Sequence, residues 1–168
     1  QMDSIVKPYV DEDLALQILG KHKTIKKEEY SIISKTMDYI PYYVFNITIS
    51  IKRSFNLNPR IIEYIYWVNS IDGKLVRSAD IPELDKFEGK SIQQKKLDME
   101  ECKQLAKKSA FKLATRFYKS FWTPEIEVVF KEKIYISFWN IGVHLTNKNE
   151  HQTFIINSFS GEVSKEVS

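Results

Sequence analysis

Two segments of the chain carry the alternation of apolar and polar positions that a β-strand requires. The first spans Tyr43–Ile51 (YVFNITISI), and the second spans Tyr135–Val143 (YISFWNIGV). Successive side chains of a strand point to opposite faces of a sheet, so a period of two indicates one buried face. We therefore predict a long strand in each half of the chain.

A ten-residue motif follows each of these strands. Tyr66–Leu75 reads YWVNSIDGKL and Phe154–Val163 reads FIINSFSGEV. Aligned without a gap, the two copies are identical at three positions: Asn69 and Asn157, Ser70 and Ser158, Gly73 and Gly161. The apolar run predicts a strand, and Asp-Gly or Ser-Gly predicts a hairpin turn in which glycine takes a positive φ.

The upstream strands also align, with Phe45–Ile49 matching Trp139–Val143 as aromatic, Asn, Ile, any residue, β-branched. Two matches in the same order favour a tandem duplication. The alternative is that hairpin chemistry produced both motifs independently.

A helix is predicted ahead of the strands in each half. Asp11–Leu19 begins with acidic residues and is followed by Gly20, and Asp98–Lys119 has Asp98 as a natural N-cap. Apolar residues recur at helical spacing in the second helix, at Leu105, Ala106, Ser109, Phe111–Leu113 and Phe117. We expect an additional strand before each long one, at Tyr30–Met37 and Glu125–Lys131.

These elements predict an α+β fold made of two tandem repeats, each a helix followed by an antiparallel β-meander with the helix packed on the sheet. The first repeat would span residues 1–80 and the second residues 98–168. Residues 81–97 contain Pro82, Gly89 and several charges, and are predicted to form the linker.

Composition limits the class of protein. The chain has 168 residues, of which 43% are hydrophobic and 13% aromatic, so a disordered chain is excluded. A single cysteine excludes a disulfide scaffold, and the apolar runs are too short to cross a bilayer. The formal net charge is +3, with lysines interspersed among acids, a pattern that disfavours nucleic acid as a partner.

The helix, the alternating strand and the turn motif together resemble the PepSY domain, a small cystatin-like module. The residues that carry the resemblance are Trp67–Leu75 and Ile155–Val163. The family has Asp where Asn69 and Asn157 stand, and Ser160 also departs from its pattern. The resemblance implies a non-catalytic, frequently extracytoplasmic module that inhibits peptidases or binds other ligands, and it supplies no catalytic residues.

The search for chemistry predicts no catalytic residue, no metal site and no cofactor. The three histidines, His22, His144 and His151, do not fall into a metal-ligand spacing. Cys102 lies in the first turn of the second helix without a recognisable Cys-His signature, so a buried structural thiol is expected.

The aromatic residues provide the candidate binding site. Alternation sends neighbouring aromatics to opposite sheet faces, so one set fills the core and the other lines a groove or is covered. The candidates are Tyr42, Tyr64, Tyr66, Trp67 and Trp139. We expect a binding or regulatory module that holds a protein or peptide partner on an aromatic sheet face or in a groove between the repeats.

Two other functions remain open at this stage. One is a structural protein that forms a homo-oligomer through sheet edges, and the weaker one is a nucleic-acid binder. The start of the chain (QMDSIVKPYV) does not resemble a secretory signal. The compartment stays undetermined, and contact with a membrane would need a segment that this chain does not contain.

Overall fold

The computed structural model describes residues 3–54, 57–88, 95–117 and 122–166. Strands account for 49% of the structure and helices for 18%. The elements in chain order are β1 (Ser4–Val6), α1 (Glu12–Gly20), β2 (Tyr30–Ile51), β3 (Arg60–Asn69), β4 (Leu75–Ser78), β5 (Leu84–Lys86), α2 (Met99–Phe117), β6 (Glu125–Leu145), β7 (Glu150–Asn157) and β8 (Val163–Lys165).

The eight strands form one mixed sheet, so the predicted fold class is wrong. The order of neighbouring strands is β4-β3-β2-β6-β1-β5, with β7 paired to β6 and β8 paired to β7. The predicted hairpins are present, because β2–β3, β3–β4, β6–β7 and β7–β8 are all antiparallel. What fails is the prediction of two separate modules in which a helix covers the meander that follows it.

The chain divides into two compact units, and neither unit is a continuous stretch of sequence. We call residues 1–40, 83–93 and 135–168 unit 1, and residues 41–82 and 94–134 unit 2. The expected domains 1–80 and 98–168, with the linker 81–97, do not follow these divisions. Each unit takes residues from both halves of the chain, because β2 and β6 contribute to both units.

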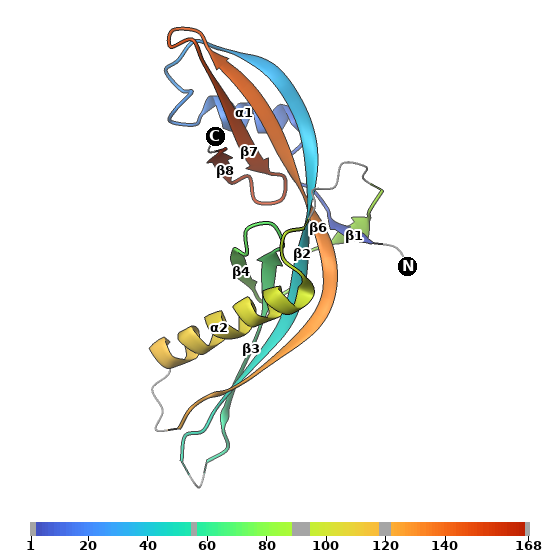
Figure 1. Cartoon of the computed structure of the whole chain (residues 1–168), viewed down its shortest axis with the longest axis vertical. Coiled ribbons are helices and arrows are strands. Elements are labelled where there is room, and N and C mark those ends of the chain that lie inside the picture. Colours follow the sequence, from blue (N-terminus) through green and yellow to red (C-terminus); the bar gives the residue numbers. More distant parts are fainter. Residues whose placement is uncertain (1–2, 55–56, 89–94, 118–121, 167–168) are drawn as a thin grey trace. The chain divides into compact units, whose positions relative to one another are not determined.

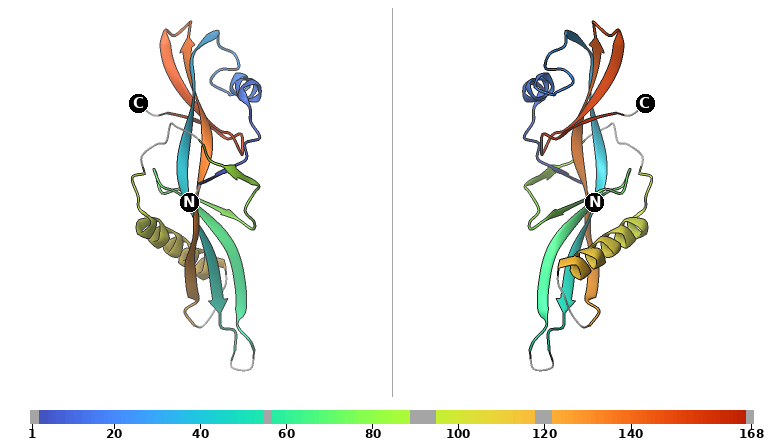
Figure 2. Two further views of the ribbon diagram at one scale, coloured as in Figure 1. Left: turned by 90° about the vertical axis from the view of Figure 1, so that its right-hand side faces the viewer. Right: turned by 90° about the vertical axis from the view of Figure 1, so that its left-hand side faces the viewer.

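In each unit the helix comes from one half of the chain and the hairpin from the other. In unit 2, α2 packs on β2, β3 and β4 through a core that includes Phe45, Tyr66 and Ala106. In unit 1, α1 packs on β6 and β7 through a core that includes Leu19, Ile141 and Phe154. Figure 1 shows α2 beside β3 and α1 beside β7 and β8, and the two side views in Figure 2 show the same neighbours.

The length of β2 explains why each helix packs on the hairpin of the other half of the chain, an arrangement that we call the helix exchange. The expected strands Tyr30–Met37 and Tyr43–Ile51 are one strand of 22 residues. The residues between them contain no glycine or Asn-Gly pair to make a hairpin turn, and Pro41 continues the strand while its carbonyl accepts from Ser70. The second long strand, β6, likewise combines Glu125–Lys131 with the segment after it in 21 residues. Because β2 and β6 do not turn, the C-terminal half of each strand belongs to a different unit from the helix that precedes the strand in the chain.

Local capping determines where both helices begin. The Asp11 carboxylate accepts from the Leu14 amide at 2.8 Å, and the Asp98 carboxylate accepts from the Glu101 amide at 2.8 Å. The predicted N-termini are therefore confirmed. Gly20 is the last residue of α1 and not the residue after it. The predicted end of α2 at Lys119 lies outside the described residues. Residues 89–94 of the expected linker also lie outside them.

Within the described part of the chain, neither helix has the length and apolar character that crossing a bilayer requires.

Candidate functional site

The two copies of the turn motif occupy equivalent places in their hairpins. The Gly73 amide donates to the Asn69 carbonyl at 2.8 Å, and the Gly161 amide donates to the Asn157 carbonyl at the same distance. Gly73 has φ +75° and Gly161 has φ +77°, so both turns use the left-handed region that glycine enters without strain. The Asn side chain closes each turn, because its Oδ1 accepts from the amide two residues ahead at 2.8 Å.

The same motif also anchors the segment that leads into the helix of its unit. The Ser70 carbonyl accepts from the amides of Lys96 and Leu97, and the Ser158 carbonyl accepts from those of Tyr9 and Val10. The turn glycines then lie under the helices: an added Cβ at Gly73 would be 3.0 Å from Leu105 Cδ1, and one at Gly161 would be 3.5 Å from Ile18 Cδ1.

The register of the long strands differs by two residues from the sequence alignment. Tyr42 pairs with Asn69, and Phe138 pairs with Asn157. Phe45 therefore corresponds to Ile141 and not to Trp139. Because a strand repeats every two residues, this shift leaves the same face buried.

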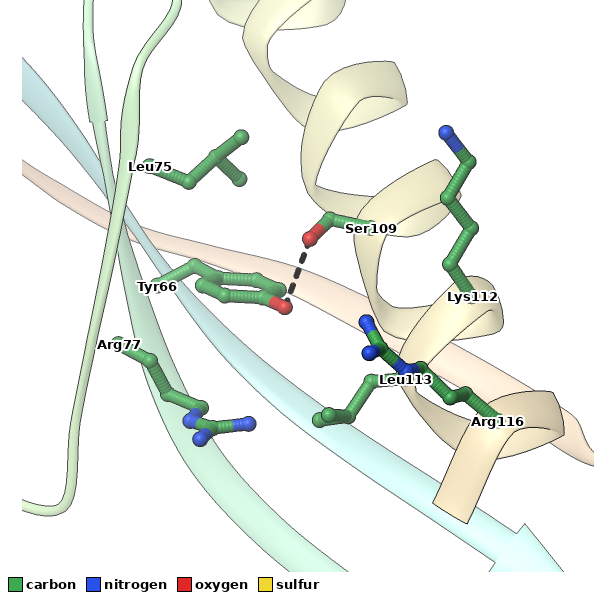
Figure 3. A pocket seen from close by; sticks show the side chains of 7 residues that line it. All are labelled: Tyr66, Leu75, Arg77, Ser109, Lys112, Leu113 and Arg116. Atoms are coloured by element: carbon green, nitrogen blue, oxygen red, sulfur yellow. Dashed lines mark hydrogen bonds between the residues drawn. The ribbon is translucent and has the colours of Figure 1, made fainter. Parts of the chain in front are cut away.

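A pocket of about 370 Å³ opens in unit 2 between β4 and α2, and we call it the cationic pocket. Three of its seven lining residues are basic, and none of the seven is acidic. The lining residues are Tyr66, Leu75, Arg77, Ser109, Lys112, Leu113 and Arg116. Figure 3 shows Arg77 reaching in from the strand side and Arg116 from the helix side, while the amino group of Lys112 points away from Tyr66.

A pair of hydroxyl groups lies between these bases. Tyr66 Oη and Ser109 Oγ are 2.9 Å apart and share one hydrogen bond (Figure 3). Two hydroxyls carry two hydrogens, and their mutual bond uses only one, so the other is left to donate to a ligand. The Arg77 guanidinium also lies 5.8 Å from the centre of the Tyr64 ring, close enough for a cation–π interaction that helps to position it.

The corresponding place in unit 1 carries different side chains. Aligning Asn157 with Asn69 places Phe154 where unit 2 has Tyr66. Aligning the N-cap Asp11 with the N-cap Asp98 places His22 where unit 2 has Ser109. The His22 ring contacts the Phe154 ring at 5.3 Å, as this correspondence requires. α1 ends at Gly20, so unit 1 has no helical turns that correspond to the turns of α2 carrying Lys112 and Arg116. Lys165 pairs with Phe154 as Arg77 pairs with Tyr66, so the hairpin of unit 1 keeps this base while the bases from the helix have no counterpart on α1.

Three of the five aromatic candidates are buried and two are half-buried. Tyr42, Tyr66 and Trp67 are only 5–6% exposed, so the expected exposed aromatic face is corrected at these positions. Asn69 Nδ2 donates to the Tyr42 hydroxyl at 3.1 Å, and Trp67 Nε1 donates to Ser78 Oγ at 3.0 Å. Each polar group of a buried ring finds a partner inside unit 2.

The remaining two candidates are half-buried. Trp139 Nε1 donates to the Val10 carbonyl at 2.8 Å, so this ring holds the segment before α1 in unit 1. Tyr64 packs edge-on against Tyr66, with ring centres 5.0 Å apart, and lines a second hollow of about 520 Å³ together with Glu63 and Glu127. Of the five, only Tyr66 lies in the cationic pocket.

The other reactive side chains do not form a site. Cys102 is fully buried against the sheet, and this burial, followed by the charges of Asp98 and Glu101, raises the pKa of its thiol to about 11. The pKa of His22 is lowered, first by burial and then by Lys165 and Lys23. No group of three or more His, Cys, Asp or Glu residues that could hold a metal ion occurs in the described ranges.

His144 and His151 lie closer together than their sequence spacing suggested. They are direct cross-strand partners on β6 and β7, with ring centres 4.9 Å apart. His144 belongs to β6 and His151 to β7.

Sequence reasoning missed the cationic pocket. The basic stretch Lys103–Lys119 was visible, and it contains Lys112 and Arg116, but it indicates only a solvated helix face. Arg77 lies in the other half of the chain. Nothing local connects Arg77 to that helix, because the connection depends on the exchange of helices between the halves.

No family model, curated protein or solved structure matches this chain. The resemblance to the PepSY domain therefore stays a prediction.

Proposed function

We propose that the protein is a non-catalytic binding module that holds a protein or peptide partner by seating an acidic segment of it in the cationic pocket. The observation that carries the proposal is the lining itself: Arg77, Lys112 and Arg116 surround about 370 Å³, and no lining residue is a carboxylate. Bases that line a pocket with no carboxylate among its lining residues attract an acidic ligand and set its orientation.

The pocket also offers contacts beyond charge. Tyr66 and Ser109 supply a hydroxyl hydrogen at its base, and Leu75 and Leu113 supply apolar surface. Bases at the rim with a small apolar and polar interior are the usual composition of a specific binding site. Unit 1 has Phe154 in place of Tyr66 and so lacks this hydroxyl, which supports a role for it in binding over a role in folding.

The test measures the fluorescence anisotropy of a fluorescein-labelled peptide in which four Asp residues are separated by Gly and Ser. We expect saturable binding to the full chain, and at least about a tenfold loss in Arg77→Gln and in Arg116→Gln, since a charge-assisted hydrogen bond contributes roughly 1.5–3 kcal/mol.

The matched control is Lys107→Gln, which removes the same charge from an exposed position of α2 that does not line the pocket. It should leave the dissociation constant nearly unchanged. If Lys107→Gln weakens binding as much as Arg77→Gln does, the attraction comes from net charge and the proposal is wrong. It is equally wrong if the peptide does not bind.

A further inference from the structure

Two guanidinium groups converge on the cationic pocket from different elements. Arg77 comes from β4 and Arg116 from α2, and Figure 3 shows both extending toward the space beside the Tyr66 hydroxyl. A guanidinium presents its donors as a planar fork that matches two oxygens of one anion. Two forks on opposite sides therefore suit an anion with at least three acceptor oxygens, whereas one carboxylate has only two.

The charge of the pocket lining also suits an anion with more than one negative charge. Arg77 and Arg116 extend toward one small space, and Lys112 adds a third positive charge to its lining although its amino group points away from Tyr66. A single carboxylate brings one negative charge, while a phosphate monoester brings about 1.5 to 2 at neutral pH together with three strong acceptor oxygens. The remaining hydroxyl hydrogen of the Tyr66–Ser109 pair is one more donor for such a group.

We propose that the group bound in the cationic pocket is a phosphorylated side chain of a protein partner. This inference rests on the proposed function and specifies its ligand. The volume of about 370 Å³ is near the lower end of the range for ligand pockets, so it admits a side chain and not a folded segment. Leu75 and Leu113 would contact the carbon stem of the phosphorylated residue.

Other phosphate-bearing partners fit the surroundings less well. A nucleic acid or an anionic membrane is recognised by bases that extend along a surface. The lining of the cationic pocket holds three bases and no carboxylate, while the second hollow is lined by Glu63 and Glu127. The pattern favours one phosphate group in one place.

The experiment compares four versions of one labelled acidic peptide on the full chain, with phosphoserine, phosphotyrosine, serine or aspartate at the central position. We expect one of the phosphorylated peptides to bind at least about tenfold more tightly than the aspartate version. This advantage should be lost in Arg77→Lys, which keeps the charge but not the fork. It should shrink in Tyr66→Phe, and Lys107→Gln should retain it. Thermal unfolding of each variant, followed by circular dichroism, verifies that it is folded.

Each other outcome overturns the proposal in a recognisable way. If the aspartate and phosphorylated peptides bind equally well, the module binds acidic segments and the inference about phosphate is wrong. If no peptide binds, the proposed function fails with it. If inorganic phosphate competes as well as the phosphopeptide, the pocket does not recognise a peptide. If phosphoinositide vesicles or a single-stranded oligonucleotide bind more tightly, the partner is not a phosphorylated protein.

Discussion

Asn69 and Asn157 close the two hairpin turns with the same Oδ1 geometry, but they differ in what their amide groups reach. Asn69 is only 8% exposed, and its Nδ2 also donates to the Tyr42 hydroxyl. The residue that corresponds to Tyr42 in unit 1 is Phe138, which has no hydroxyl. Equivalent residues of the two units are thus free to acquire different roles.

This difference makes a prediction for stability. Asn157→Ala removes the turn contacts alone and should lower the free energy of unfolding by about 1 kcal/mol, while Asn69→Ala also removes a buried hydrogen bond and should cost about 2–3 kcal/mol. Urea unfolding followed by circular dichroism measures both. An equal or larger effect of Asn157→Ala would contradict this assignment of the contacts.

Individual residues could be predicted from the sequence where their role is local. The turn residues Asn69 and Gly73 and the cap Asp98 act within a few residues of themselves, and the sequence identified all three. Arg77 could not be identified, because its significance comes from α2 in the other half of the chain. The aromatic candidates were misjudged for the same reason: whether Tyr42 or Trp67 is covered depends on distant parts of the fold.

At the scale of elements, α2 owes its position to a stripe of small residues. Cys102, Ala106, Ala110 and Ala114 are all fully buried and recur every four residues. Small side chains let the helix approach the sheet that carries Phe45 and Tyr66. A larger side chain in this stripe would have to push the helix and the sheet apart.

Ala110→Leu should therefore destabilise the protein by about 1–3 kcal/mol in urea unfolding. The neighbouring Phe111 is 42% exposed and provides the control, since Phe111→Leu should change the stability by about 0.5 kcal/mol or less. A neutral Ala110→Leu would mean that α2 does not pack closely on the strands through this face.

Helices and turns could be predicted more reliably from the sequence than the continuity and register of the strands. The hairpin turns and the starts of α1 and α2 have local chemical signals, and they appear where expected. The continuity of β2 has no such signal, since Pro41 suggests an interruption that does not occur. The two-residue error in aligning the long strands has a related cause: a strand pattern repeats every two residues, so it cannot distinguish registers that differ by two.

At the scale of the whole molecule, the repeated sequence builds two units of related geometry by exchanging helices. Exchange of equal elements between copies is a known low-cost arrangement between separate chains, and here it occurs inside one chain. The functional consequence is direct, because Tyr66 and Arg77 of the cationic pocket come from the first half and Ser109 and Arg116 from the second. The pocket forms only if the halves exchange their helices.

Nuclear Overhauser contacts of the turn glycines test this exchange most directly, in the full chain with labelled methyl groups. We predict cross-peaks from the Leu105 δ-methyl to the α-protons of Gly73, and from the Ile18 δ-methyl to those of Gly161. Cross-peaks from Ile18 to Gly73 and from Leu105 to Gly161 would mean that each helix covers its own half. That result would contradict both the exchange and the pocket that depends on it.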